Sequence, residues 1–321
     1  MLHEVMDYYG IGQDFRQAGF FETIHYHQLF AALKTAIRQG HLVALCGLVG
    51  CGKTTLLQRM QAELAREKDI LVARSLAVDK DRVHLGTLIT ALFYDLSTEK
   101  DAKIPTQPEK RERQLLELIK KRQRPVALFI DEAHDLHGKT LTGLKRLMEL
   151  VRHQGDLLAV VLAGHPKLKH DLRRPTMEEI GARATVLTLE GIQGQQREYL
   201  RWLLDQCTTS DDEAILTPAA MDLLADALAT PLQMDQYLTL ALEAGYRAGQ
   251  KPVTPEVIAS VLARGLDDIE PTLARHGYTA KTLADVLHVP SAEMRAFLRG
   301  RLPPGRAQEL QSELRAVGLP L

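Results

Sequence analysis

One glycine-rich segment near the amino end has the residue types and the spacing needed to bind a polyphosphate. It follows the pattern G-x-x-x-x-G-K-[ST] and reads Gly47, Leu48, Val49, Gly50, Cys51, Gly52, Lys53 and Thr54. Its glycines allow the backbone to curl so that successive amide groups point at one anion. Lys53 can reach the β- and γ-phosphates, and the Thr54 hydroxyl can bind Mg²⁺. We predict that this loop and the adjoining Thr55 bind ATP together with Mg²⁺.

Two acids, Asp131 and Glu132, directly follow the apolar run 126–130. A carboxylate at this position can hold the Mg²⁺ shell together with Thr54, and the next one can orient and polarise the attacking water. The alternative is a strand that ends in surface acids. We predict that Asp131 is a metal ligand and that Glu132 is the catalytic base. His134 completes an Asp-Glu-Ala-His string shared with one class of helicases, but no further helicase motif is present.

Polar residues near the later strands are further catalytic candidates. His165 follows the apolar run 157–163 and could contact the γ-phosphate or the attacking water; alternatively, it is an ordinary loop histidine. Arg173, Arg174 and Arg183 precede the last predicted strand. An arginine here could reach the γ-phosphate of a neighbouring subunit. We select Arg183 for that role, with solvated surface arginines as the alternative.

The elements that would position these residues alternate between short apolar runs and helical patterns. Strands are predicted at 41–46, 70–75, 126–130, 157–163 and 185–189. Helices are predicted at 54–67, 84–97, 109–122 and 140–152. Because the strands are continuously apolar, we expect burial on both faces. The fold class is therefore α/β, with a five-stranded parallel sheet flanked by helices.

The second half of the chain reads as helices alone. These are predicted at 194–207, 217–228, 232–248 and 254–264. The sign of the local charge then changes from acidic to basic, which indicates a domain boundary. We predict a nucleotide-binding domain over 1–190, a helical lid over 191–265 and a small C-terminal domain over 266–321.

The 321-residue chain has the composition of an ordinary globular protein, with 45% hydrophobic and 25% charged residues. Its net charge of −1 argues against a uniformly basic nucleic-acid binder, so any such contact must be local. Its three cysteines suit a reducing compartment. The sequence has no apolar run long enough to cross a bilayer and no signal-peptide pattern at its amino end. We expect a cytoplasmic protein without membrane contact.

Together, the phosphate loop, the acids at 131–132, the Gly-His-Pro string and the helical lid resemble an AAA+ ATPase. More narrowly, residues 6–264 resemble the bacterial branch that includes ExeA-type ATPases and the transposition regulators TnsC, TniB and MuB. The segments 8–11 and 20–23 resemble the opening of that branch, which packs near the adenine. One departure is Gln233, at the lid position where many relatives carry an arginine. We therefore expect slow hydrolysis that DNA or oligomerisation stimulates, with ATP acting mainly as an assembly switch; the alternative is that another subunit supplies the missing cation.

The segment 279–300 reads as two short helices joined by a tight turn at His288, with Thr279 and Ser291 as N-caps. It resembles the helix-turn-helix of λ-repressor-like domains. The resemblance implies that the second helix faces the major groove with Ser291, Ala292, Glu293 and Arg295. Phosphate contacts are expected from Arg299, Arg301 and Arg306, and from loop residues Lys80, Arg82, Lys100 and Lys103. The alternative is a helical protein-interaction module with solvated arginines.

The resemblance implies an ATP-dependent regulator of DNA transposition. Such a protein would assemble as a ring or filament of identical subunits on double-stranded DNA and recruit or activate a transposase. Two alternatives stay open: an ExeA-like ATPase that serves secretion or the cell envelope, and a transcriptional regulator that responds to ATP.

Overall fold

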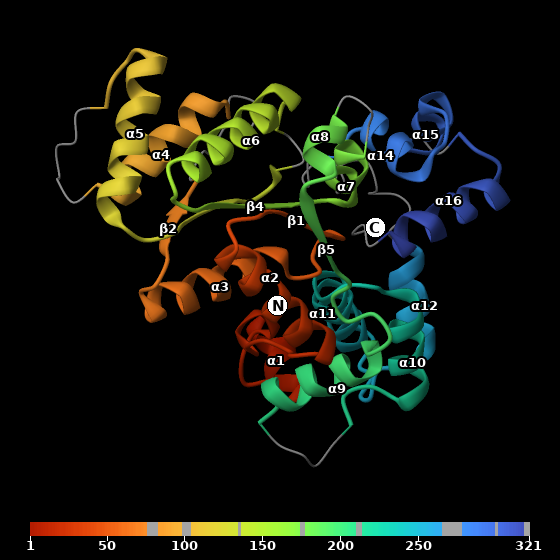
Figure 1. Ribbon diagram of the computed structural model, residues 1–321. Coiled ribbons are helices and arrows are strands. Elements are labelled where there is room, and N and C mark those ends of the chain that lie inside the picture. The colour runs from red at the N-terminus through yellow and green to blue at the C-terminus, as the bar shows by residue number, and fades with distance from the viewer. Residues whose placement is uncertain are drawn as a thin grey trace. The chain divides into compact units, whose positions relative to one another are not determined.

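The computed structural model describes residues 1–75, 83–97, 104–133, 136–173, 177–209, 214–264, 278–298 and 301–317. The chain divides into two compact units, which are described separately (Figure 1). The sheet unit comprises residues 24–47 and 52–189. The helical unit comprises residues 1–23, 48–51 and 190–321.

The sheet unit is built on five parallel strands in the order β2-β3-β4-β1-β5. They are β1 (Leu42–Gly47), β2 (Leu71–Arg74), β3 (Val126–Ile130), β4 (Leu158–Gly164) and β5 (Ala184–Leu189). Every residue of β1, β3 and β4 is buried, whereas most of the edge strand β5 is only partly buried. The predicted parallel five-stranded sheet is therefore confirmed, and each predicted strand end lies within one residue of the observed end.

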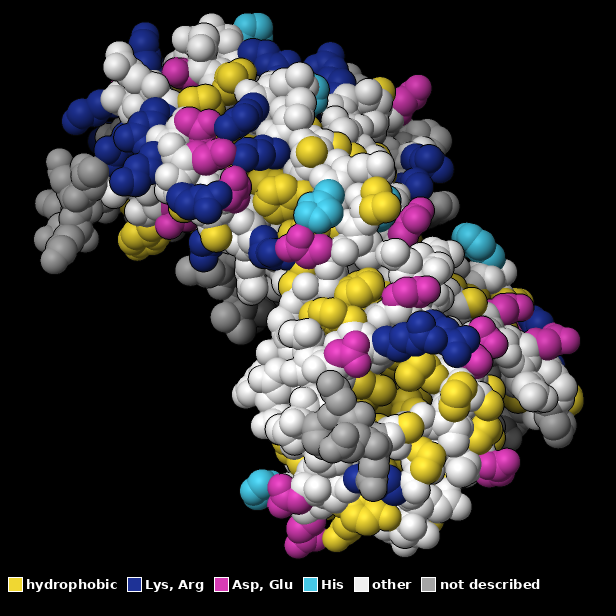
Figure 2. All heavy atoms as spheres, turned by 90° about the horizontal axis from the view of Figure 1, so that it is seen from below, with side chains coloured by type: hydrophobic (Ala, Val, Ile, Leu, Met, Phe, Trp, Pro, Cys, Tyr) yellow, Lys and Arg dark blue, Asp and Glu magenta, His cyan; other side chains and the backbone are white. Residues whose placement is uncertain are grey.

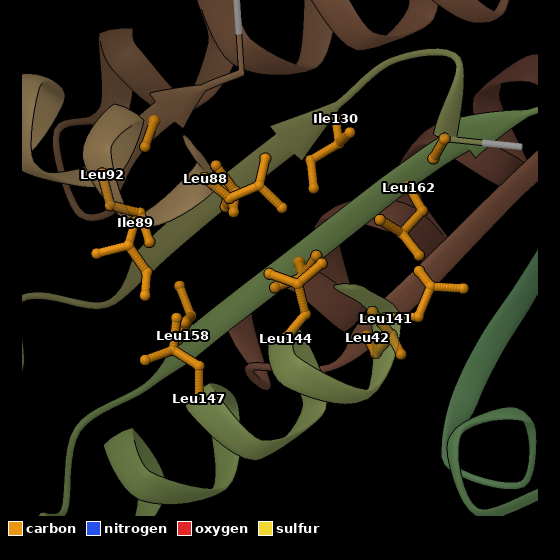
Figure 3. Close-up of a cluster of buried hydrophobic side chains, with 14 of the residues drawn as sticks. Leu42, Leu88, Ile89, Leu92, Ile130, Leu141, Leu144, Leu147, Leu158 and Leu162 are labelled. Atoms are coloured by element: carbon orange, nitrogen blue, oxygen red, sulfur yellow. The ribbon is translucent and has the colours of Figure 1, made fainter. Parts of the chain in front are cut away.

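Helices flank this sheet (Figure 1). They are α2 (Ile24–Arg38), α3 (Lys53–Glu67), α4 (Leu85–Leu96), α5 (Pro108–Arg122), α6 (Gly138–His153), α7 (Pro166–Leu172) and α8 (Glu178–Gly181). Helix α6 begins two residues earlier than predicted because the His137 side chain accepts a hydrogen bond from the Lys139 amide and caps it. Leucines of α4 and α6 pack against β1, β3 and β4 to form the core, as Figure 3 shows for Leu88, Leu144 and Leu158.

The helical unit combines the amino-terminal segment with the lid. Its first elements are α1 (His3–Tyr9), η1 (Phe15–Gln17), α9 (Gln196–Cys207), α10 (Pro218–Ala227), α11 (Pro231–Arg247) and α12 (Pro255–Arg264). The Gly12 amide donates to the Cys207 carbonyl at 2.7 Å, and the Tyr9 hydroxyl donates to the Gln250 carbonyl at 2.8 Å. The amino-terminal segment thus packs on lid helices far away in the sequence, in one hydrophobic cluster.

The carboxyl-terminal part of the helical unit is a bundle of α14 (Ala280–Leu287), α15 (Ser291–Leu298) and α16 (Pro304–Ala316). The predicted pair of short helices is present, and α16 is an additional helix. His288 joins α14 to α15 in a left-handed conformation with φ of 56°. Thr279 caps α14 as predicted, but α15 begins at Ser291 itself, so this serine lies in the first turn rather than before it.

Within the described ranges, no helix has both the length and the apolar character that a bilayer-spanning helix requires.

Candidate active site

The glycine-rich loop follows β1 and leads into α3, as its motif predicts. Gly50 and Gly52 have φ of 73° and 100°, values that side chains with a Cβ rarely adopt. The Gly50 carbonyl also accepts a hydrogen bond from the Leu232 amide at 3.4 Å, within the helical unit. A Cβ on Gly50 would clash with the Leu232 side chain. Glycine is therefore required here both by the backbone conformation and by the close approach of the lid.

Lys53 is the first residue of α3 and is only 6% exposed. Its ammonium donates a hydrogen bond to the Gly47 carbonyl at 2.9 Å. A buried ammonium needs hydrogen-bond partners, and this contact holds it at the base of the loop. The charge therefore lies beside the Gly47 carbonyl, where the glycine-rich segment begins.

The two predicted metal ligands lie together although they are far apart in the sequence. The Thr54 hydroxyl donates to Oδ2 of Asp131 at 2.7 Å, which joins the start of α3 to the end of β3. Both groups offer hard oxygen donors. Mg²⁺ typically takes one or two carboxylates and keeps several waters, so this small donor set fits Mg²⁺.

Glu132 lies beside this pair in a strained backbone conformation. Its φ is 54°, and its amide donates to Oδ1 of Asp131 at 2.8 Å. A left-handed conformation at a residue other than glycine costs about 1–3 kcal/mol and often marks a functional site. Nε2 of His165 lies 3.7 Å from Oε2 of Glu132, so the ends of β3 and β4 bring the predicted base and the predicted sensor together.

The predicted arginine lies at the opposite end of the sheet. Arg183 immediately precedes β5, whose first residue Ala184 pairs with Leu42 at the start of β1, whereas the phosphate loop follows the end of β1. Nη1 of Arg183 lies 2.6 Å from Oε1 of Glu149. Arg183 therefore lies near the opposite end of β1 from Gly47, where the phosphate loop begins. Its role toward the γ-phosphate of another subunit stays a prediction. Arg173 is exposed after α7.

The lid glutamine has a structural explanation. Gln233 is 1% exposed, and its side-chain oxygen accepts hydrogen bonds from the amides of Ala229 and Thr230 at 2.9 and 3.2 Å. The Thr230 hydroxyl in turn accepts from the Gln233 amide. This reciprocal capping box begins α11. Gln233 therefore caps a helix where relatives were expected to place a cation.

Of the expected DNA contacts, those that lie in the described residues are Ser291, Ala292, Glu293, Arg295, Arg301 and Arg306. Nε of Arg295 donates to the Ser291 carbonyl at 3.2 Å, and Arg301 is exposed. Arg306 and Glu293, also expected at the DNA, form an ion pair with each other at 2.8 Å, and their contact with DNA stays a prediction. Arg306 also pairs with the carboxylate of Glu309, and its hydrogen bonds to Glu293 and Glu309 raise the pKa of the guanidinium. Further candidates lie outside the described residues, namely Lys80, Arg82, Lys100, Lys103, His134, Arg174 and Arg299.

Two features of the structure were not predicted from the sequence. Val49 of the phosphate loop packs, within the helical unit, against the hydrophobic cluster of the C-terminal bundle. Helix α5 exposes four cations, Lys110, Arg113, Lys120 and Lys121. Lys and Arg side chains also gather in one part of the face shown in Figure 2. The spacing of the α5 cations, close to a helical repeat, could have indicated this exposed face.

We expect the substitution Thr54→Val to weaken Mg²⁺-dependent ATP binding by roughly tenfold, because it removes a hydrogen-bonding oxygen beside Asp131 and keeps the branched shape. Titration of a fluorescent ATP analogue with Mg²⁺ and with EDTA measures this effect. Binding in EDTA should be unchanged, and the exposed control Thr142→Val should match the parent protein. An equal loss in both buffers would indicate a purely structural role.

The chain resembles known proteins both in sequence and in structure. Residues 37–172 match the family model described as AAA domain. The chain is 31% identical to general secretion pathway protein A of Aeromonas hydrophila over 149 residues. This match covers 46% of this chain and 26% of that protein. The chain thus spans about a quarter of the length of this relative.

Solved structures resemble nearly the whole chain at low sequence identity. Cdc6p from Pyrobaculum aerophilum aligns with a TM-score of 0.58 and 16% identity, covering 96% of this chain and 91% of that one. The Aeropyrum pernix ORC2 protein aligns with a TM-score of 0.55 and 13% identity, covering 95% of this chain and 84% of that one. Drosophila ORC bound to DNA aligns with a TM-score of 0.55 and 16% identity, covering 98% of this chain and 83% of that one. This chain therefore has the α/β P-loop AAA+ fold, and its residues 37–172 match an AAA domain.

Proposed function

We propose that this protein is an AAA+ ATPase that assembles on duplex DNA in an ATP-dependent manner and regulates transposition by recruiting or activating a transposase. The observation that carries the ATPase part is the joint placement of Lys53, Thr54, Asp131 and Glu132 at one end of the parallel sheet. These are the groups that bind phosphate, hold Mg²⁺ and activate water in P-loop ATPases.

The residues divide the chemistry among themselves. Lys53 would exchange its contact with the Gly47 carbonyl for one with the phosphates. Thr54 and Asp131 would hold Mg²⁺, which when bound neutralises phosphate charge. The Glu132 carboxylate would accept a proton from the attacking water. His165, whose Nε2 lies 3.7 Å from Oε2 of Glu132, would help to hold that carboxylate in place.

Contacts of the phosphate loop support a role as a switch. The Gly50 carbonyl is bound by the Leu232 amide of the lid, and Val49 packs against the core of the C-terminal bundle. A loop that changes conformation around a polyphosphate would therefore act on the lid and on the C-terminal bundle. Packed contacts of this kind can bias two alternative arrangements, which is the physical basis of a nucleotide switch.

The DNA part rests on softer support. Drosophila ORC and the Aeropyrum pernix ORC1 protein, which has a TM-score of 0.53, 15% identity and coverage of 92% and 84%, were both solved with DNA. This likeness concerns the fold alone. Within this chain, the short helices α14 and α15 and the exposed Arg295 and Arg301 are compatible with a DNA-binding helix-turn-helix.

A gel-shift assay with unrelated duplex DNA fragments tests this proposal. We expect retarded complexes with ATP and Mg²⁺, much weaker ones with ADP, and little dependence on the DNA sequence. Electron microscopy of the same mixtures should show rings or filaments on the DNA. No shift under any nucleotide condition would contradict the DNA part, whereas preference for one operator sequence would favour a transcriptional regulator.

A second candidate function is supported by the match to general secretion pathway protein A. In this case the ATPase would serve secretion or envelope assembly and would bind duplex DNA no better than an unrelated acidic protein does. ATP binding would be preserved, so the gel-shift assay separates the two functions while calorimetry with ATP tests the site that they share.

A further inference from the structure

A pocket of about 270 Å³ lies in the sheet unit, away from the candidate active site. It is bounded by the start of β1, by α6 and by the residues just before β5. Its floor is apolar and consists of Leu42, Met148 and Ile180, of which Leu42 and Ile180 are buried. An apolar floor of this kind favours the binding of a hydrophobic side chain.

Charged side chains of one predominant sign surround this floor. Lys145, Arg152 and Arg183 contribute three cations, and Glu149 contributes the single carboxylate among the lining residues. Oε1 of Glu149 lies 2.6 Å from Nη1 of Arg183 and 3.7 Å from Nζ of Lys145. Glu149 thus contacts two of these cations, while Arg152 donates to the neutral Gly40 carbonyl at 3.3 Å. The exposed Arg152 therefore gives the rim a positive charge that a further carboxylate would complement.

We propose that this pocket binds an acidic segment of a partner protein, with an aliphatic side chain on the floor and carboxylates at the rim. The volume is below that of pockets that enclose whole cofactors, which run from about 300 Å³ upward, so it suits one or two side chains of a peptide. Phosphate contacts to nucleic acid need exposed cations but no apolar floor. The combination of both features therefore favours a peptide over DNA.

The pocket lies at the amino ends of β1 and β5, whereas the phosphate loop follows the carboxyl end of β1. A partner could bind here while nucleotide occupies the loop. The inference goes beyond the proposed function and does not rest on it, because none of the pocket residues belongs to the phosphate loop or the metal site of this chain.

The test uses the full chain and a short fluorescein-labelled peptide of alternating aspartate and leucine, followed by fluorescence anisotropy. We expect Arg152→Glu to weaken binding roughly tenfold or more, since it reverses a rim charge. Glu149→Gln should strengthen binding by about threefold, because it removes the internal carboxylate that competes for Arg183 and Lys145. Lys139→Glu changes an exposed cation of the same helix outside the pocket, and serves as the matched control with unchanged affinity.

Two further peptides define the chemistry. Replacing leucine by serine should abolish binding if the apolar floor is used, and replacing aspartate by lysine should abolish it if the rim charge is used. Equal binding of either peptide, or no effect of Arg152→Glu, would overturn the proposal. If the parent protein does not bind the peptide and Arg152→Glu loses duplex DNA binding, the rim would instead be assigned to contacts with DNA phosphates. Circular dichroism and ATP titration of each variant establish that it is folded, and peptide binding should persist in Lys53→Ala, so the two proposals fail independently.

Discussion

Replacing Lys53 with alanine is expected to reduce ATP affinity by roughly 10- to 150-fold, since a hydrogen bond to a charged group contributes about 1.5–3 kcal/mol. The side chain is buried and already directed into the loop by its contact with the Gly47 carbonyl, so its position needs little reorganisation when phosphate binds. The variant should also lose ATP-dependent assembly on DNA, because both depend on the same loop. Isothermal titration calorimetry measures the first effect, and electron microscopy with DNA measures the second.

The matched control for this experiment is Lys120→Ala, which removes an exposed lysine from α5 and should leave ATP affinity unchanged. Assembly on DNA that continues in Lys53→Ala despite lost ATP binding would contradict the switch. In that case the contacts of Gly50 with Leu232 and of Val49 with the C-terminal bundle would be structural only.

The sheet could be predicted from the sequence because burial on both faces leaves a clear pattern. The run 126–130 matches β3 from end to end, since Pro125 precedes it and two acids follow it. Helix α16 was not predicted because its residues are mostly polar, and only Leu310 and Leu314 among them are fully buried apolar side chains. The helices α7 and α8 are too short for a periodic pattern to be recognised.

The parts of the site that could not be predicted depend on tertiary contacts. The motif predicts that Thr54 and Asp131 share a metal, but only the parallel register of β1, β4 and β3 brings their oxygens within 2.7 Å. The capping role of Gln233 requires knowing where α11 begins. The pocket beside Arg152 joins segments more than 100 residues apart, since Arg152 contacts Gly40. A single sequence does not contain these distances.

The substitution Glu132→Gln is expected to lower the rate of ATP hydrolysis by about 10²–10⁴-fold, the usual contribution of a general base. Glutamine has the same shape, and the backbone amide of residue 132 can still donate to Asp131, so the metal site should persist. ATP affinity should therefore stay close to that of the parent protein. Because nucleotide is bound but not turned over, ATP-bound assemblies on DNA should accumulate and dissociate slowly.

Phosphate release under single-turnover conditions measures the chemical step, and the lifetime of gel-shifted complexes after dilution measures the trapped state. Glu117→Gln, an exposed carboxylate on α5, is the matched control and should behave as the parent protein. Unchanged hydrolysis in Glu132→Gln would assign the base to another group. His165, whose Nε2 lies 3.7 Å from Oε2 of Glu132, would then be the first residue to substitute. Slow hydrolysis without longer-lived complexes would separate catalysis from assembly and would leave nucleotide binding alone as the switch.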